Sequence, residues 1–122
     1  MTVRKLLFSA AVIVIAASNV HATESLFFNS DDYTIQILVG YTDDPVVAQV
    51  RFTSPEAKEA VLLPREALQV EKFDMKKEIL TLRFSNTNNP DLPASFSLSV
   101  KNSKAVLSTG GKEIKGEFNW DI

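Results

Sequence analysis

Residues 95–100 read Ser-Phe-Ser-Leu-Ser-Val, so an apolar side chain follows a serine at every second position. In a β-strand successive side chains point to opposite faces, so such a stretch buries one face and leaves the other in water. The same alternation runs through residues 114–122, where apolar residues and glycine alternate with Lys, Glu, Asn and Asp. Further apolar rows occupy residues 33–41, 48–52 and 80–84. The period of two predicts half-buried strands.

Short polar segments separate these rows. They lie at residues 29–32, 42–45, 75–77, 86–93, 102–103 and 110–111. Asn, Asp, Gly and Pro dominate most of them, because these residues adopt or pre-set the backbone angles of turns. Seven to nine short strands, with turns about every 8–12 residues, predict an all-β fold, either an antiparallel β-sandwich or a small barrel. Gly40 and Gly116 fall inside strand patterns, where glycine indicates a bulge or a close backbone approach.

One segment departs from the strand pattern. Ser54 is a favourable helix cap, Pro55 suits the first helical position, and residues 56–60 are mostly good helix formers. We therefore expect one short helical turn near residues 55–60, which ends before Pro64.

The N-terminal residues have the composition of a secretory signal. A basic start precedes an apolar stretch of 12 residues, and small or β-branched residues stand at Val20 and Ala22. The stretch is shorter than the roughly 18 apolar residues that cross a membrane. We therefore expect residues 1–22 to be a signal peptide and residues 23–122 to form a single all-β domain. The product would be periplasmic or secreted, with no membrane insertion after cleavage.

The composition after that cleavage excludes several chemistries. Eleven Lys and Arg then stand against fifteen Asp and Glu, a net charge of −4, which does not suit nucleic acid or an anionic membrane surface as partner. The single His is His21, and the chain has no Cys. Without imidazole or thiol there can be no Ser-His-Asp triad, no cysteine nucleophile and no His/Cys zinc site. We therefore predict a protein that is not an enzyme and has no catalytic residues, cofactor or metal.

Two acidic pairs are the candidates for a catalytic carboxylate site. Residues 31–32 and 43–44 are both Asp-Asp, and they flank one predicted strand. At about 3.4 Å per residue the pairs lie some 30 Å apart, too far for the two carboxylates of a glycosidase. A calcium site stays open, because residues 43–44 would meet Asn86, Asn88 and Asp91 if their two loops lay at the same end of the sheet.

Four residues are candidates for contact with a protein. Leu26, Phe27 and Phe28 cannot all face inward on one strand. Either both faces of this strand are buried, or Phe27 or Phe28 is exposed for a partner. Asn88 and Asp91 lie in the longest predicted loop, which could enter a cleft of another molecule.

These observations predict a small exported binding protein of the bacterial cell envelope. Its partner would be another envelope or extracellular protein, and an inhibitor or immunity protein against a hydrolase is the specific form we expect. A strand edge that accepts main-chain hydrogen bonds is a second route to such binding. The alternatives are a structural or accessory subunit of a surface assembly, or a carbohydrate-binding module with an exposed Trp or Tyr. The sequence leaves the oligomeric state open.

Overall fold

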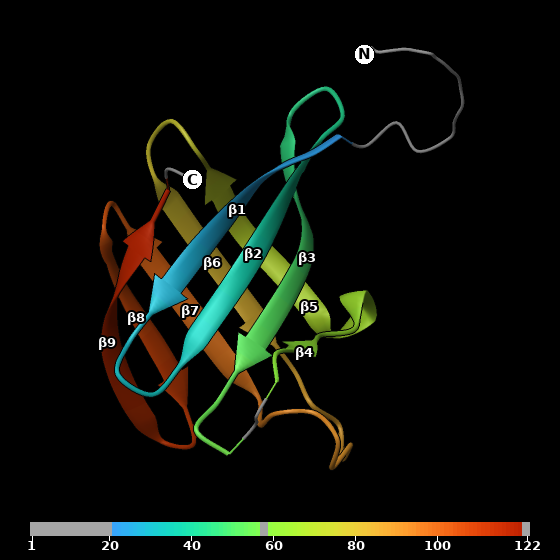
Figure 1. Cartoon of the computed structure of the whole chain (residues 1–122), viewed down its shortest axis with the longest axis vertical. Helices are drawn as coiled ribbons and strands as arrows, with labels where there is room; N and C mark the ends of the chain where they lie inside the picture. Colours follow the sequence, from blue (N-terminus) through green and yellow to red (C-terminus); the bar gives the residue numbers. More distant parts are fainter. Residues whose placement is uncertain (1–20, 57–58, 121–122) are drawn as a thin grey trace.

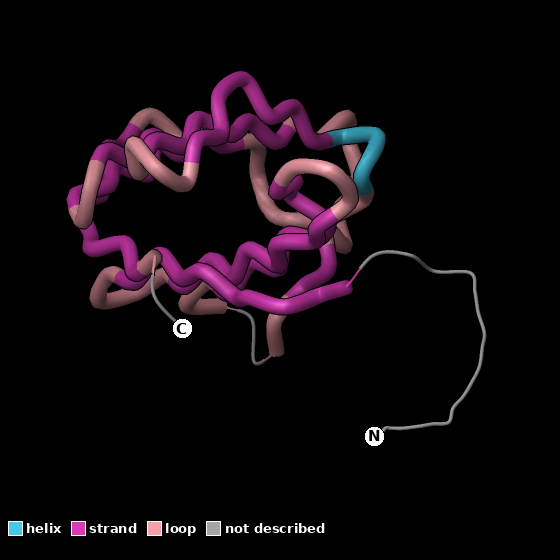
Figure 2. Tube along the Cα trace, turned by 90° about the horizontal axis from the view of Figure 1, so that it is seen from above, coloured by secondary structure: helices cyan, strands magenta, loops and turns pink. Residues whose placement is uncertain are grey.

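The computed structural model describes residues 21–56 and 59–120, and these form one curled antiparallel sheet (Figures 1 and 2). The described strands are β1 (His21–Asn29), β2 (Thr34–Tyr41), β3 (Pro45–Thr53), β4 (Val61–Leu62), β5 (Leu68–Asp74), β6 (Ile79–Phe84), β7 (Phe96–Lys101), β8 (Lys104–Thr109) and β9 (Lys112–Asn119). The predicted all-β class, with seven to nine short strands, is confirmed, and the sheet has the form of a half-barrel.

The sheet consists of two meanders that meet at one junction. Its strand order is β4-β3-β2-β1-β9-β8-β7-β6-β5, so β1 to β4 and β5 to β9 each pair with their neighbours in sequence. β1 and β9 join the two meanders through the pairs Phe27–Asn119, Phe28–Phe118 and Asn29–Glu117. β4 and β5 are the outer strands of the sheet. The half-barrel is therefore closed by hydrogen bonds on one side and remains open at a seam on the other.

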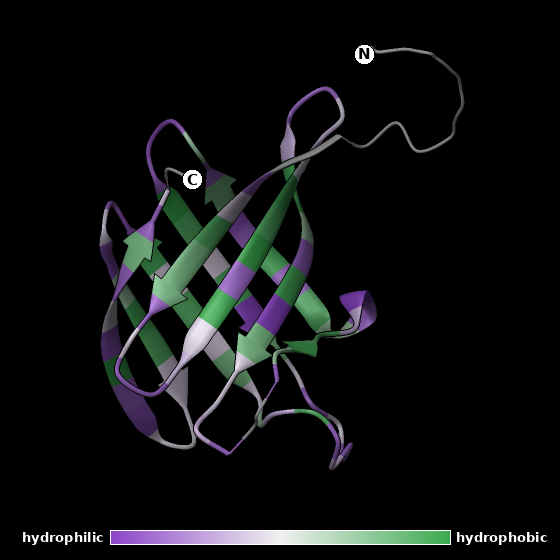
Figure 3. Cartoon of the chain, viewed as in Figure 1, coloured by the Kyte–Doolittle hydropathy of each residue, from purple (hydrophilic) through white to green (hydrophobic). Residues whose placement is uncertain are grey.

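The core fills the space between the two meanders. The predicted alternation is confirmed in β2, β6 and β7, where buried residues alternate with more exposed ones. Figure 3 shows the matching alternation of hydropathy along β2. Aromatic rings join the two halves, since Phe52 of β3 stacks on Phe96 of β7 with ring centroids 4.9 Å apart. Within the β5–β9 meander, the Phe73 ring stacks on Trp120, and Phe118 meets Trp120 edge to face. No polar or charged side chain is buried in the part of the chain that the structure describes.

Tight turns between strands use the residues that the sequence offers for them. Asn102 has a φ of 58° between β7 and β8, while Gly110 and Gly111 have φ values of 57° and 76° between β8 and β9. These left-handed values are easiest for glycine and common for asparagine. In the β8–β9 turn both central residues have positive φ, which twists the hairpin in the direction that the flanking strands require.

Gly116 marks a close approach of two strands, as its place in a strand pattern predicts. A Cβ atom at this position would lie 2.5 Å from the Asn29 carbonyl oxygen and 2.5 Å from a ring carbon of Phe28. The side chain of Phe28 thus covers the gap that the glycine leaves. The β1–β9 junction depends on this contact, because β1 reaches β9 only over its last three residues.

The short helix lies later in the chain than predicted. Pro55 and Glu56 form a turn and Glu59 a bend, while residues 57–58 lie outside the described part. Within the described ranges the one helical segment is a 3-10 turn at Arg65–Ala67. The pairing of Phe52 with Val61 closes the intervening loop. The described residues of the predicted segment thus form a turn and a bend, and the helical turn of the described chain follows Pro64.

Most of the predicted signal peptide lies outside the described residues. The described chain begins within it, since His21 and Ala22 are the first residues of β1 and pair with Tyr41 and Gly40. The ladder shifts register between Ala22 and Glu24, next to the predicted cleavage point. Among the described residues no helix has the length and apolar character needed to span a bilayer.

Candidate functional site

The loop at residues 85–95, which connects β6 to β7, is organised around one side chain. The Asn86 amide nitrogen donates to the carbonyl oxygens of Asn89 (2.9 Å), Leu92 (3.3 Å) and Pro93 (2.8 Å). The Asn86 amide oxygen accepts from the backbone N–H of Asn89 at 2.8 Å. A single asparagine therefore ties together the two arms of the loop and its centre.

Further contacts fix the ends and the tip. The backbone N–H of Asn86 donates to the Ser95 hydroxyl at 2.8 Å, which closes the base of the loop. The N–H of Asp91 donates to the Asn89 side-chain oxygen at 2.9 Å, and Leu92 packs against the core. Asn88 has a φ of 72°, a value that asparagine accepts more readily than most residues. The loop is thus ordered by hydrogen bonds, a core contact and local backbone conformation together.

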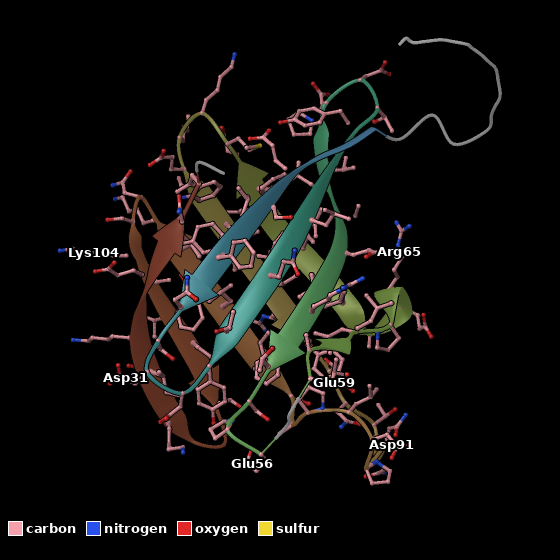
Figure 4. All side chains as sticks on the ribbon, in the orientation of Figure 1. Asp31, Glu56, Glu59, Arg65, Asp91 and Lys104 are labelled. Atoms are coloured by element: carbon pink, nitrogen blue, oxygen red, sulfur yellow. The ribbon has the colours of Figure 1, made fainter. Side chains whose placement is uncertain are left out.

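The tip of this loop projects from the end of the half-barrel. Residues 87–91 are all exposed, and Figure 4 shows Asp91 at the outer extremity of the loop. An open hollow of about 560 Å³ lies along one side, and its lining includes Asn88 and Pro90. A loop that is already ordered loses less conformational entropy when it binds than a mobile one. The arrangement can therefore present an amide, a proline ring and a carboxylate to a partner in fixed positions.

The structure places both predicted loop residues, Asn88 and Asp91, on this exposed tip. Sequence reasoning missed Asn86 as the residue that organises the loop. The available signal is its position at the start of an Asn- and Pro-rich segment, since asparagine side chains often bond to nearby backbone groups in turns. Asp91 is the only charged residue between residues 85 and 95, so the tip carries a single negative charge.

The structure separates the other two candidates, Phe27 and Phe28. Phe28 is fully buried in the core beside Gly116, so its side chain is not available to a partner. Phe27 points to the opposite face of β1 and is half-buried, opposite Gln36 of β2 and Asn119 of β9. The sequence left two alternatives for this strand, with both faces buried or with one ring exposed. The structure places the Phe28 ring inward and the Phe27 ring partly exposed on the other face.

The two loops that would share a calcium ion lie far apart. Residues 42–44 connect β2 to β3 at one end of the half-barrel, and the 85–95 loop lies at the other (Figure 1). The condition for a calcium site shared by these loops is therefore not met, and the described residues contain no group of three or more His, Cys, Asp or Glu arranged to hold a metal ion. As predicted, the two Asp pairs lie beyond opposite ends of β2.

Asp31 and Asp32 instead border an open hollow of about 740 Å³ between the β1–β2 turn and β9. Lys115 and Glu117 contribute further charges of both signs to its wall. None of these charged side chains is buried. The hollow therefore lacks the fixed, desolvated polar groups that orient a small ligand.

Trp120 is a core residue. Its side chain is 6% exposed, and its indole N–H donates to the Asn102 carbonyl oxygen at 2.6 Å. Tyr33 and Tyr41 are partly buried and pack against the core. These positions do not provide the freely exposed Trp or Tyr on which a carbohydrate-binding module would rely.

Removing the Asn86 side chain is expected to loosen the loop while the half-barrel stays folded. Asn86→Ala deletes four hydrogen bonds to the backbone, so hydrogen exchange at the amides of Asn89 and Asp91 should speed up markedly. The free energy of unfolding should fall by only about 1 kcal/mol, because the site is partly solvated. Thr87→Ala, at an exposed neighbour, is the control. Unchanged exchange in Asn86→Ala would show that the side chain does not order the loop.

Comparison of the chain with protein-family models, with curated proteins and with solved structures gives no match in any of the three.

Proposed function

We propose that this chain is a non-enzymatic, protein-binding protein of the bacterial cell envelope, and that it inserts the 85–95 loop into a cleft of its partner. The observation that carries the proposal is the Asn86-centred hydrogen-bond network, which holds an exposed tip in one conformation. Rigid loops on β-scaffolds suit recognition, because the scaffold supplies the ordering that binding would otherwise require.

The chemistry of the tip defines the cleft that would accept it. Asp91 carries the only charge of the loop, and Asn88 offers both a donor and an acceptor. Pro90 adds an apolar ring of fixed φ between them. A complementary cleft therefore contains a Lys, Arg or cluster of N–H donors for Asp91, beside a small apolar surface. An inhibitor or immunity protein that blocks a hydrolase would act in this way.

The envelope assignment rests on the sequence. The signal-like N-terminus predicts export, and the product would be a mildly acidic, cysteine-free domain without imidazole. The lack of His removes the side chain that most often serves as general acid or base near neutral pH. These features support a binding role over a catalytic one.

A quantitative comparison of loop variants tests the proposal. The immobilised chain would capture its partner from envelope extracts, and the purified partner would then be titrated against wild type and against an Asn88→Ala/Asp91→Ala double variant. We expect Kd to rise at least tenfold in the double variant, since interface hot spots are worth about 2 kcal/mol or more. If the partner is a hydrolase, its inhibition should weaken in parallel.

Two controls identify the loop as the cause. Lys104→Ala alters an exposed charge on β8, away from the loop (Figure 4), and should leave Kd unchanged. Asn86→Ala leaves both tip side chains in place but loosens the loop, so it should weaken binding by an intermediate factor. Equal affinity of wild type and the double variant would refute the loop as the binding site.

A further inference from the structure

The seam between β3 and β5 leaves two strand edges without a strand partner. β5 is the outer strand of its meander, and β4 pairs with β3 only at Arg51 and Phe52. Within the described part of the chain, the seam-facing edge of β3 therefore has no paired strand over Pro45 to Gln49, and that of β5 has none over its whole length. Figure 2 shows the chain as a flattened ring, and this seam is the place where its strands are not hydrogen-bonded to each other.

The most exposed large apolar side chains of the described residues border this seam. Val46 of β3 is 39% exposed, Leu62 of β4 51% and Val70 of β5 41%. Val70 pairs with the fully buried Leu82, so it faces the interior of the half-barrel and is nevertheless accessible from outside. Val46 and Leu62 lie on the outer face, since their neighbours Val47 and Val61 pair with the buried Val39 and Phe52. Large apolar side chains that remain exposed on strand edges are typical of interaction surfaces.

A small pocket opens into the seam. Its lining consists of four apolar residues and one cation: Val47, Ala48, Leu68, Val70 and Arg65. Its volume is about 120 Å³. An apolar cavity of about 150 Å³ accommodates benzene, so this pocket has room for one branched aliphatic side chain.

The backbone of β5 is oriented to receive a strand beside this pocket. The N–H of Ser85 donates to the Ala67 carbonyl oxygen at 3.0 Å, so Ala67 and Ser85 form a hydrogen-bonded pair. In an antiparallel ladder such pairs alternate with non-hydrogen-bonded ones, so the next hydrogen-bonded pair of β5 and β6 is Gln69 with Arg83. By alternation, the N–H and C=O of Val70 point away from β6 and toward the seam. The ladder shifts register just after Val70, so regular pairing on this edge is limited to the few residues next to the pocket.

Arg65 gives the pocket a preference for negative charge. Arg65 is exposed at the pocket. The salt bridge among the described side chains joins Arg83 to Glu71, so it does not occupy the Arg65 guanidinium. A guanidinium with free donors binds a carboxylate in a two-pronged geometry. The seam therefore combines main-chain donors and acceptors, an aliphatic pocket and one available cation.

We propose that this seam binds an extended, acidic peptide segment of another protein. The peptide backbone pairs with Val70, one aliphatic side chain enters the pocket, and a neighbouring carboxylate contacts Arg65. This mode adds a strand to an exposed sheet edge, with a side-chain pocket for selectivity. It uses a different surface from the 85–95 loop and is independent of what that loop binds.

Synthetic peptides test this assignment directly. The probes are two fluorescently labelled six-residue peptides, one alternating valine with glutamate and the other alternating valine with lysine. Binding of each peptide to the full chain is measured by fluorescence anisotropy. We expect the glutamate peptide to bind at least tenfold more tightly than the lysine peptide. Because the chain has a formal net charge of −2, its overall field favours the lysine peptide, so the expected preference reports the local site. A glutamate peptide with N-methylated backbone amides should not bind.

Variants assign the contacts. Arg65→Glu should reverse the preference between the two peptides, and Val70→Asp should abolish binding of the glutamate peptide. Lys104→Glu is the matched charge reversal, since Figure 4 shows Lys104 and Arg65 on opposite sides of the molecule. The proposal is overturned by the absence of binding at millimolar concentration, by equal binding of both peptides, or by an unchanged preference in Arg65→Glu. Formation of a dimer that blocks peptide binding would assign the seam to a second copy instead and would also overturn it.

Discussion

Gly116→Val is expected to lower the free energy of unfolding by about 3 kcal/mol, as overpacking of a well-packed site does. The new Cβ would lie 2.5 Å from the Asn29 carbonyl oxygen and 2.5 Å from the Phe28 ring. A ring can rotate, but a backbone carbonyl can move only if β1 moves with it. The variant therefore pushes apart the junction that joins the two meanders. Urea unfolding, followed by Trp120 fluorescence, gives the change in stability.

Gly110 provides a matched comparison, because its backbone conformation, and not a lack of space, favours glycine there. A Cβ there would meet nothing within 4 Å, but φ is 57°. Gly110→Ala should cost only about 1 kcal/mol from backbone strain, and Gly110→Asn less, since asparagine tolerates this conformation. If Gly116→Val unfolded at the same urea concentration as Gly110→Asn, the close packing at the junction would be disproved.

Phe28→Ala is expected to destabilise the protein by about 3–5 kcal/mol, the usual cost of removing a fully buried phenylalanine. Phe28 has no exposed surface and covers Gly116 at the junction. Phe27→Ala, at the adjacent position, should cost about 1 kcal/mol, because its half-buried ring lies on the outer face of the sheet. Small domains have a total free energy of unfolding of about 5–15 kcal/mol, so Phe28→Ala should lose a large share of its stability.

Equilibrium unfolding of the two variants under identical conditions checks this contrast. Their midpoints should differ clearly while the dependence on urea concentration stays the same. Similar losses for Phe27→Ala and Phe28→Ala would contradict the assignment of opposite faces in β1. Phe27→Ala can also be titrated against the captured partner, which tests separately whether this half-exposed ring contributes to binding.

The strands could be predicted from the sequence because their signal is local. Alternation such as that of residues 95–100 reports which side of a strand is buried, and Gly110-Gly111 reports a tight turn. Gly116 could also be recognised as a close approach, because its neighbours continue the pattern on both sides. These inferences need only the physics of one strand or one turn.

The remaining features depend on contacts between distant residues. Nothing local to residues 54–60 reveals that Phe52 pairs with Val61 and so closes the loop between them. The separation of residues 43–44 from the 85–95 loop follows from the strand order, which alternation does not encode. Asn86 could be recognised as a turn former, but its three carbonyl partners become apparent only when the loop is folded.

The pairing of β1 with β9 also constrains how the protein can be made. Phe27 meets Asn119, so nearly all of the described chain must be synthesised before the two meanders can be joined. Contacts between residues so distant in sequence slow folding, because a large loop must close before they form. A polypeptide that cannot complete its sheet while still emerging from the ribosome stays unfolded for longer and depends on its full length before the half-barrel can close.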